Sequence, residues 1–143
     1  MCYIVYMSIS TRLQNYFFKR RLKKSGLVFP LQRTLRGTKS LDRQGALLQT
    51  QPNDELQFVH VPLKAYPYNT YAYSVYLNRV LGYLDQDTAK KLVYVFGEGF
   101  CLDGEIKTLT NKETDPFISA VVRIYDGKTM MSDIDDFKPL RGE

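Results

Sequence analysis

Residues 65–84, AYPYNTYAYSVYLNRVLGYL, constrain the fold of this chain more than any other stretch. The segment holds six of the eleven tyrosines and a single charged side chain, Arg79. Tyrosine and β-branched residues favour half-buried strands, and Asn78-Arg79 has the two-residue length of a tight hairpin between 72–77 and 80–84. The segment therefore predicts a loop at Pro67 followed by two neighbouring strands, whose tyrosines form either a stacking surface or a barrel wall.

Helical spacing occurs twice. Over 8–24 the apolar side chains Ile9, Leu13 and Phe17 recur at the helical period, and Gly26 ends the pattern. A second helix is predicted to begin after Asp85, an N-cap residue, and to run through residue 96, because Gly97 stands where a left-handed stop belongs. Further strands are expected at 27–35, 56–61, 100–109 and 117–125, with a turn-like stretch at 38–44, one helical turn at 46–48 and a polar loop at 110–116. The last strand alternates, with Ile118, Ala120, Val122 and Ile124 on one face.

Five or six short strands around one main helix predict a mostly β protein with helices, of the α+β class. The expected architecture is a small, partly open β-barrel in the manner of an OB-fold. We expect three regions: a basic amphipathic N-terminal helix at 1–26, the barrel domain at 27–125, and an acidic, flexible tail at 126–143.

Positive charge is concentrated in the N-terminal third. Residues 1–43 hold ten Lys or Arg against one acid, Asp42, a net charge of +9, whereas the remaining hundred residues hold ten basic and fourteen acidic side chains, a net charge of −4. Such a basic region attracts a polyanion, most commonly a nucleic acid. An anionic membrane surface or an acidic protein satisfies the same electrostatics.

The predicted N-terminal helix carries a ridge of basic side chains beside its apolar stripe. Lys19 with Lys23, and Arg20 with Lys24, stand one turn apart. Three interpretations remain open for this helix. Its apolar side packs on the domain while its basic side faces solvent, or its basic side contacts phosphates, or it lies on a membrane surface.

No residue pattern indicates catalysis or a cofactor. The single histidine, His60, lies within a predicted strand and is interpreted as a packed histidine, because one histidine cannot build a His-rich metal site. The acidic group Asp133, Asp135 and Asp136 lacks the glycine and distal glutamate of a calcium loop. We therefore expect a non-enzymatic protein without a metal or cofactor.

The location is predicted to be cytoplasmic. Cys2 and Cys101 are too few for a disulfide framework and are expected to be reduced thiols. Residues 1–7 are apolar but too short for a secretory signal. No run approaches the roughly 20 apolar residues that span a bilayer, so no integral membrane association is expected.

Four motifs, in this order, resemble the HIRAN domain. They are Arg36-Gly37-Thr38, Pro52-Asn53-Asp54-Glu55-Leu56, Tyr66-Pro67-Tyr68-Asn69-Thr70-Tyr71-Ala72-Tyr73-Ser74-Val75 and Leu81-Gly82-Tyr83-Leu84, and a predicted helix follows. The resemblance covers residues 27–125. HIRAN domains occur as small bacterial or phage proteins and as modules of DNA-remodelling helicases. The resemblance implies an OB-like barrel that binds the 3′ end of single-stranded DNA.

The resemblance also implies site residues. By position, Tyr68 stacks on a base and Asn69 contacts the terminal 3′ hydroxyl, while Arg33 and Arg36 lie near the first strand that approaches DNA. The chain departs from the family pattern at Asn69, where the family has aspartate, and at Tyr71, where it has asparagine. After Leu84 the family has proline and a basic residue, and this chain has Asp85-Gln86.

The predicted function is a nucleic-acid-binding module for single-stranded DNA, or RNA, or its 3′ end. Its predicted contacts are Arg33, Arg36, Tyr68, Asn69, Tyr71, Lys19, Arg20, Lys23 and Lys24. The alternative is a protein interaction or assembly module, such as a phage or mobile-element component, that uses the tyrosine-rich face.

Overall fold

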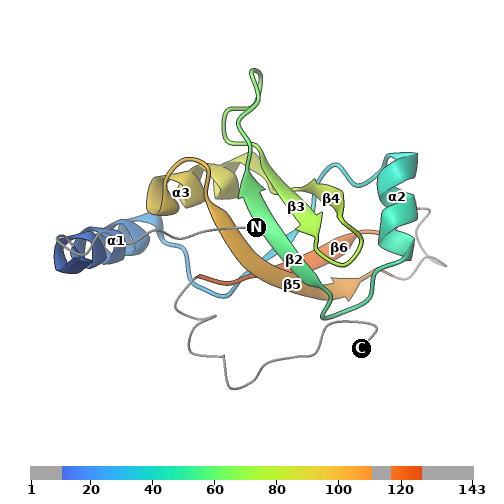
Figure 1. Ribbon diagram of the computed structural model, residues 1–143, viewed down its shortest axis with the longest axis horizontal. Helices are drawn as coiled ribbons and strands as arrows, with labels where there is room; N and C mark the ends of the chain where they lie inside the picture. The colour runs from blue at the N-terminus through green and yellow to red at the C-terminus, as the bar shows by residue number, and fades with distance from the viewer. Residues whose placement is uncertain (1–10, 111–116, 127–143) are drawn as a thin grey trace.

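The computed structural model describes residues 11–110 and 117–126. These residues form the helices α1 (Thr11–Ser25), α2 (Leu41–Leu48) and α3 (Gln86–Phe96), and the strands β1 (Leu31–Thr34), β2 (Glu55–His60), β3 (Thr70–Ser74), β4 (Arg79–Tyr83), β5 (Cys101–Leu109) and β6 (Ala120–Ile124). The strands form one sheet in the order β1-β6-β5-β2-β3-β4, with every neighbouring pair antiparallel. Figure 1 shows that the sheet curls, with α1 and α2 at opposite ends of the molecule. The predicted α+β class with a barrel-like sheet is confirmed.

The two edges of the curled sheet meet just after β1. The chain follows β6 as far as Leu35, whose N–H donates to the carbonyl of Ala120 over 2.9 Å. The next residue, Arg36, pairs instead with Tyr83 at the end of β4, through N–H to O distances of 2.8 Å and 2.9 Å in the two directions. This isolated bridge brings the two edge strands, β1 and β4, together at one point, and among the described residues the curled sheet is otherwise open between them.

The interior of the curled sheet is mostly apolar, and β3 adds the fully buried hydroxyl side chains of Thr70 and Ser74. Along β2, β3 and β6, buried and half-buried residues alternate, as expected for strands with one face on a core. The alternation predicted for 117–125 is confirmed, since Ile118, Ala120, Val122 and Ile124 are buried. The largest fully buried apolar side chains are Phe58, Leu47, Leu56, Leu81, Leu84, Leu92, Ile106, Ile124, Val95 and Val122.

Helix α3 has the predicted bounds because residues next to each end of the helix determine where it begins and ends. The Asp85 carboxylate accepts a hydrogen bond from the Thr88 N–H over 3.0 Å, which satisfies one of the free donors at the helix start. Gly97 has φ +91° and donates its N–H to the Val93 carbonyl over 2.8 Å. The same helix buries Ala89, Leu92 and Val95.

Helix α1 packs on the C-terminal end of α3. The rings of Phe18 and Phe96 lie 5.4 Å apart, and the Arg21 guanidinium donates to the Val95 carbonyl over 3.4 Å. A cation is favourable there, because the last carbonyls of a helix lack partners and carry partial negative charge. The predicted helix is confirmed from Thr11 onward, and residues 8–10 lie outside the described part of the chain.

Two local predictions are wrong. Residues 41–48 form a complete helix, α2, where a turn-like stretch and a single helical turn were expected; Ser40 caps it by accepting the Arg43 N–H over 3.3 Å. The β3–β4 connection is also longer than two residues. Strand β3 ends at Ser74, whose carbonyl accepts the Asn78 N–H over 2.9 Å, and Asn78 takes the left-handed conformation with φ 56°.

Cys101 is disulfide-bonded, so the expectation of a reduced thiol at this position is wrong. The chain's other cysteine, Cys2, lies outside the described residues, as do residues 111–116 of the predicted loop and 127–143 of the predicted tail. Among the described helices, none is long and apolar enough to cross a membrane.

Candidate nucleic-acid interface

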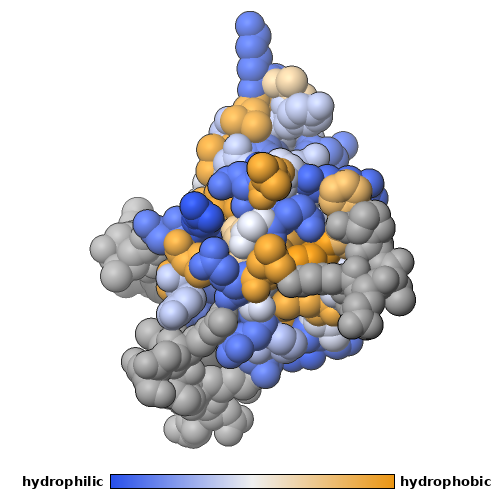
Figure 2. Space-filling model, turned by 90° about the vertical axis from the view of Figure 1, so that its right-hand side faces the viewer, coloured by the Kyte–Doolittle hydropathy of each residue, from blue (hydrophilic) through white to orange (hydrophobic). Residues whose placement is uncertain are grey.

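A pocket of about 590 Å³ lies on the outside of the barrel, beside the bridge that joins β1 to β4. The 61–69 loop, the outer face of β3 and β4 and the start of α3 contribute to its walls. Its lining residues are Arg36, Arg43, Leu63, Tyr66, Asn69, Tyr71, Tyr83, Asp85, Gln86 and Asp87. Figure 2 views the molecule from the α2 side, where hydrophobic residues form small groups separated by hydrophilic ones. Three tyrosines and two arginines thus surround one cavity.

Two glycines allow the barrel to close at this pocket. A Cβ on Gly82 would lie 2.6 Å from the Arg36 carbonyl oxygen, and a Cβ on Gly37, which has φ +66°, would lie 2.1 Å from Cε1 of Tyr83. Side chains cannot occupy either position without displacing the bridge or the Tyr83 ring. The Arg-Gly-Thr and Leu-Gly-Tyr-Leu motifs therefore meet in space, and their glycines permit close approach of backbone and ring.

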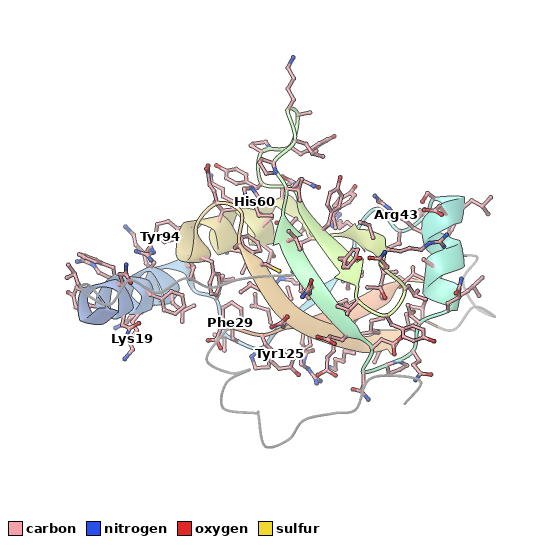
Figure 3. The ribbon with its side chains drawn as sticks, in the orientation of Figure 1. Lys19, Phe29, Arg43, His60, Tyr94 and Tyr125 are labelled. Atoms are coloured by element: carbon pink, nitrogen blue, oxygen red, sulfur yellow. The ribbon has the colours of Figure 1, made fainter. Side chains whose placement is uncertain are left out.

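The two arginines of the pocket are held differently. Arg43, on α2, donates from Nη1 to the Gly37 carbonyl over 2.6 Å, and its guanidinium carbon lies 5.8 Å from the centre of the Tyr83 ring. Figure 3 shows Arg43 on α2 at the end of the molecule away from α1. Arg36 is exposed, and its side chain forms no hydrogen bond or ion pair with any residue in the described ranges. The Arg36 guanidinium is therefore free to bind an anion.

Tyr71 and Tyr83 stand side by side on the outer wall. They are register partners on β3 and β4, and Tyr71 is also opposite Val59 on β2. Because buried Thr70, Ala72 and Ser74 alternate with Tyr71 and Tyr73, the two tyrosines of β3 point outward and are half-buried. Tyr66 adds a more exposed ring from the 61–69 loop.

Asn69 lines the pocket from the end of the 61–69 loop. The side chain is buried, and Nδ2 donates to the Val61 carbonyl over 3.1 Å. A carbonyl only accepts hydrogen bonds, so the atom facing Val61 must be the nitrogen. No described residue donates a hydrogen bond to Oδ1, and since no fully buried side-chain oxygen of the described residues lacks a partner, Oδ1 is in reach of solvent and can accept from a ligand.

His60 fixes the 61–69 loop rather than forming part of the pocket. Its Nδ1 accepts the Gly99 N–H over 2.8 Å, so Nε2 carries the hydrogen and donates to the Pro67 carbonyl over 2.8 Å. The ring is buried and stacks on Phe100 with centres 5.8 Å apart. The interpretation of His60 as a packed histidine is confirmed.

Two carboxylates line the side of the pocket formed by α3. Burial raises the pKa of Asp85, but the hydrogen bonds from Thr88 and the nearby Arg33 charge outweigh it, and the net pKa is lowered. Asp85 is therefore ionised at neutral pH. Asp87 forms an exposed ion pair with Lys91, with 3.5 Å between Nζ and Oδ2. The Asp85 carboxylate attracts hydrogen-bond donors and disfavours an anion placed directly against it, whereas the Asp87 charge is paired with Lys91.

The structure brings together only part of the predicted site. Arg36, Asn69 and Tyr71 line the pocket, but Tyr68 and Arg33 do not. Tyr68 is half-buried beside α3, with Lys90 Nζ 5.9 Å from its ring centre. Arg33 donates to Thr88 Oγ1 over 2.9 Å and to the Gln32 carbonyl over 2.8 Å, so it supports the start of α3.

The basic residues predicted on the N-terminal helix are also far from the pocket. Lys19, Arg20, Lys23 and Lys24 are exposed on α1, and Figure 3 labels Lys19 at the opposite end of the molecule from Arg43. The two predicted groups of contacts therefore belong to separate surfaces.

Sequence reasoning missed Arg43, Tyr66 and Tyr83 as pocket residues. Tyr83 had a usable signal, since strand alternation assigns Leu84 and Tyr83 to opposite faces. No sequence pattern identified Arg43 as a pocket residue, because its position depends on how α2 packs beside β4. Among the described residues, no group of three His, Cys, Asp or Glu side chains is placed to hold a metal ion.

Comparison with known proteins adds no assignment. No family model, curated protein or solved structure matches this chain.

Proposed function

We propose that this protein is a non-enzymatic module of HIRAN type that binds single-stranded nucleic acid and holds the 3′ end of a DNA strand in the pocket beside the barrel closure. The observation that carries the proposal is the convergence of Arg36, Arg43, Tyr66, Tyr71 and Tyr83 on one cavity. Binding of single strands requires aromatic faces for bases and cations for phosphates, and both are present within the same walls.

The size of the pocket supports a nucleotide as ligand. Small-molecule sites are typically about 300–1,000 Å³, and a cavity of about 590 Å³ lies within that range. Arg36 supplies a cation without a competing partner in the described chain, and Arg43 is held in place by the Gly37 carbonyl. A base stacked on Tyr71 or Tyr66 would leave its phosphate within the field of both arginines.

The acceptors in the pocket favour a strand end with a free hydroxyl. The Asn69 Oδ1 and the Asp85 carboxylate both accept hydrogen bonds, and a terminal hydroxyl has one to donate. A terminal phosphate would instead face the negative charge of Asp85, whose pKa is lowered. The proposal therefore predicts discrimination against a phosphorylated 3′ end.

The proposal transfers the stacking role from Tyr68 to the tyrosines that line the pocket. The resemblance by position assigned stacking to Tyr68, but Tyr68 is outside the lining and packed near Lys90. Tyr71, where the family has asparagine, offers its ring on the outer wall next to Tyr83. The proposed stacking surface therefore lies three residues further along the chain, on β3 instead of in the loop.

The test is titration of fluorescent oligonucleotides that carry a free or a phosphorylated 3′ end, at several salt concentrations. Tyr71→Ala should weaken binding of the free end by about 1–3 kcal/mol, the usual contribution of a stacked base. Tyr71→Phe keeps the ring and is the matched control, with binding close to that of the original protein. Loss of binding in both variants would contradict stacking, and absence of binding at low salt would refute the proposal.

A second pair of variants tests end recognition. Asp85→Asn retains a side chain able to cap α3, because asparagine caps as well as aspartate, but removes the negative charge. The preference for the free hydroxyl end should shrink in this variant. Equal affinity of the original protein for both ends would show that the pocket does not recognise the terminus.

A protein-interaction role is the second candidate. The 61–69 loop exposes Val61, Leu63 and Tyr66 next to Tyr71, and tyrosine is enriched at protein interfaces. The test is titration of a purified partner, found by proximity labelling, against Tyr71→Ala and Tyr73→Ala. Loss of that partner together with absence of oligonucleotide binding would favour this candidate.

A further inference from the structure

The exposed face of α3 connects the pocket to α1. Gln86 lines the pocket, and Lys90 and Tyr94 follow it at intervals of four residues, so the three side chains form one row along the helix. All three are exposed, with Tyr94 46% exposed. Figure 3 shows Tyr94 at the end of α3 that lies beside α1.

The row places one cation, Lys90, next to aromatic rings. Lys90 Nζ lies 5.9 Å from the centre of the Tyr68 ring, so the loop residue flanks the middle of the row. Tyr94 follows one turn later. Asp87, an acid one position away, is paired with Lys91, which reduces the negative charge beside the row. Lys90 lies between two tyrosine rings, and proteins that bind single-stranded nucleic acid without sequence preference combine cations for the phosphates with aromatic faces for the bases.

The end of the row meets a basic helix. The contacts of Phe18 with Phe96 and of Arg21 with Val95 fix α1 at the C-terminal end of α3. The exposed side of α1 carries Lys19, Arg20, Lys23 and Lys24. A strand that leaves the pocket along α3 therefore reaches positive charge at the far end.

We propose that Lys90, Tyr94 and the basic side of α1 form a second binding segment, for the nucleotides that precede the end held in the pocket. This inference rests on the proposed function. Helix α3 has 11 residues, and at a rise of ~1.5 Å per residue it spans roughly 16 Å. At ~3.4 Å per stacked nucleotide, that span holds about five nucleotides. Affinity should therefore rise with strand length beyond the few nucleotides that fill the pocket.

The experiment compares oligothymidylates of about three and about twelve nucleotides, a range that brackets typical single-strand site sizes. Fluorescence anisotropy on the full chain should give at least tenfold tighter binding of the long strand. Tyr94→Ala should weaken the long strand at least about fivefold, as expected for a lost stacked base, and leave the short strand unchanged. Lys90→Ala should lower the salt slope for the long strand by about 0.7, the contribution of one phosphate contact.

Lys107→Ala is the matched control. It removes one positive charge from β5, where Lys107 donates to Gln32 Oε1 over 2.8 Å, and leaves α3 intact. Equal effects of Lys90→Ala and Lys107→Ala, or equal affinity for both strand lengths, would overturn the second segment.

The outcomes separate this inference from the proposed function. If Tyr71→Ala weakens both strands and the α3 variants change neither, the pocket function stands and the second segment is refuted. If the long strand depends on Tyr94 but not on Tyr71, α3 and α1 bind the strand on their own, and both the pocket function and the role of this surface as its extension are refuted. If neither strand binds at low salt, both are refuted.

Discussion

Substitution of Gly82 by alanine should open the barrel where β1 meets β4. The new Cβ would lie 2.6 Å from the Arg36 carbonyl oxygen and 3.0 Å from Cγ2 of Thr38. The backbone oxygen cannot rotate away as the end of a flexible side chain would. Relief therefore requires β4 to move away from Arg36.

The cost follows from that movement. Ordinary van der Waals contact begins at 3.4 Å, so the strand must move by roughly 0.8 Å, and hydrogen bonds of 2.8 Å and 2.9 Å between Arg36 and Tyr83 would lengthen to about 3.6 Å, beyond useful hydrogen-bond length. Loss of two backbone hydrogen bonds costs about 1–3 kcal/mol in total, and residual overpacking is of similar size. We expect Gly82→Ala to lower the free energy of unfolding by about 2–6 kcal/mol, the sum of the two contributions.

Gly45→Ala is the matched control for this prediction. Gly45 lies within α2, and a Cβ there would meet no atom within 4 Å. Alanine in a helix is favoured over glycine by about 0.5–1 kcal/mol, so this variant should be more stable than the original. Urea unfolding followed by circular dichroism measures both changes. If Gly82→Ala unfolds within about 0.5 kcal/mol of the original protein, a typical error of such comparisons, the closure does not have the proposed role.

Two further predictions concern the outer wall and the 61–69 loop. Burial and the neighbouring Asp103 carboxylate raise the pKa of Glu55; a raised folded-state pKa of an acid means that stability falls as the pH rises through it. Glu55→Gln should therefore increase the free energy of unfolding at pH 7 by about 0.2–1 kcal/mol, the size of cross-strand charge effects. It should also reduce the fall in stability between acidic and neutral pH. An identical pH profile of stability in both proteins would contradict this prediction. His60→Phe keeps a ring next to Phe100 but removes the hydrogen bonds to Gly99 and Pro67, at a cost of about 1–3 kcal/mol. Amide hydrogen exchange at the Asn69 N–H should accelerate in this variant, and unchanged exchange there would show that His60 does not hold the loop.

Local signals determined the elements whose ends are set within a few residues. Asp85 and Gly97 bracket α3 because a carboxylate caps a helix start and a glycine ends it through contacts within one turn. The alternation from Ile118 to Ile124 identified the inner face of β6, because successive side chains of a strand point to opposite sides. Helix α2 was missed because Asp42, Arg43, Gln44 and Gly45 interrupt its apolar period, so its burial through Ala46 and Leu47 gave too short a signal.

The candidate site depended on pairings that no local pattern encodes. The sequence alone identified the tyrosine-rich segment, the basic N-terminal third and the glycine motifs. Only the tertiary structure decided that the chain, which pairs with β6 up to Leu35, pairs with Tyr83 of β4 at Arg36. It also decided that Arg43 reaches this place from α2, and that Tyr71, not Tyr68, lines the pocket. The physical reason is the sequence distance over which each interaction acts. Helix caps and strand alternation depend on residues a few positions apart, whereas the meeting of β1 with β4 depends on the curl of all six strands and on the register shift between Ala72 and Tyr73.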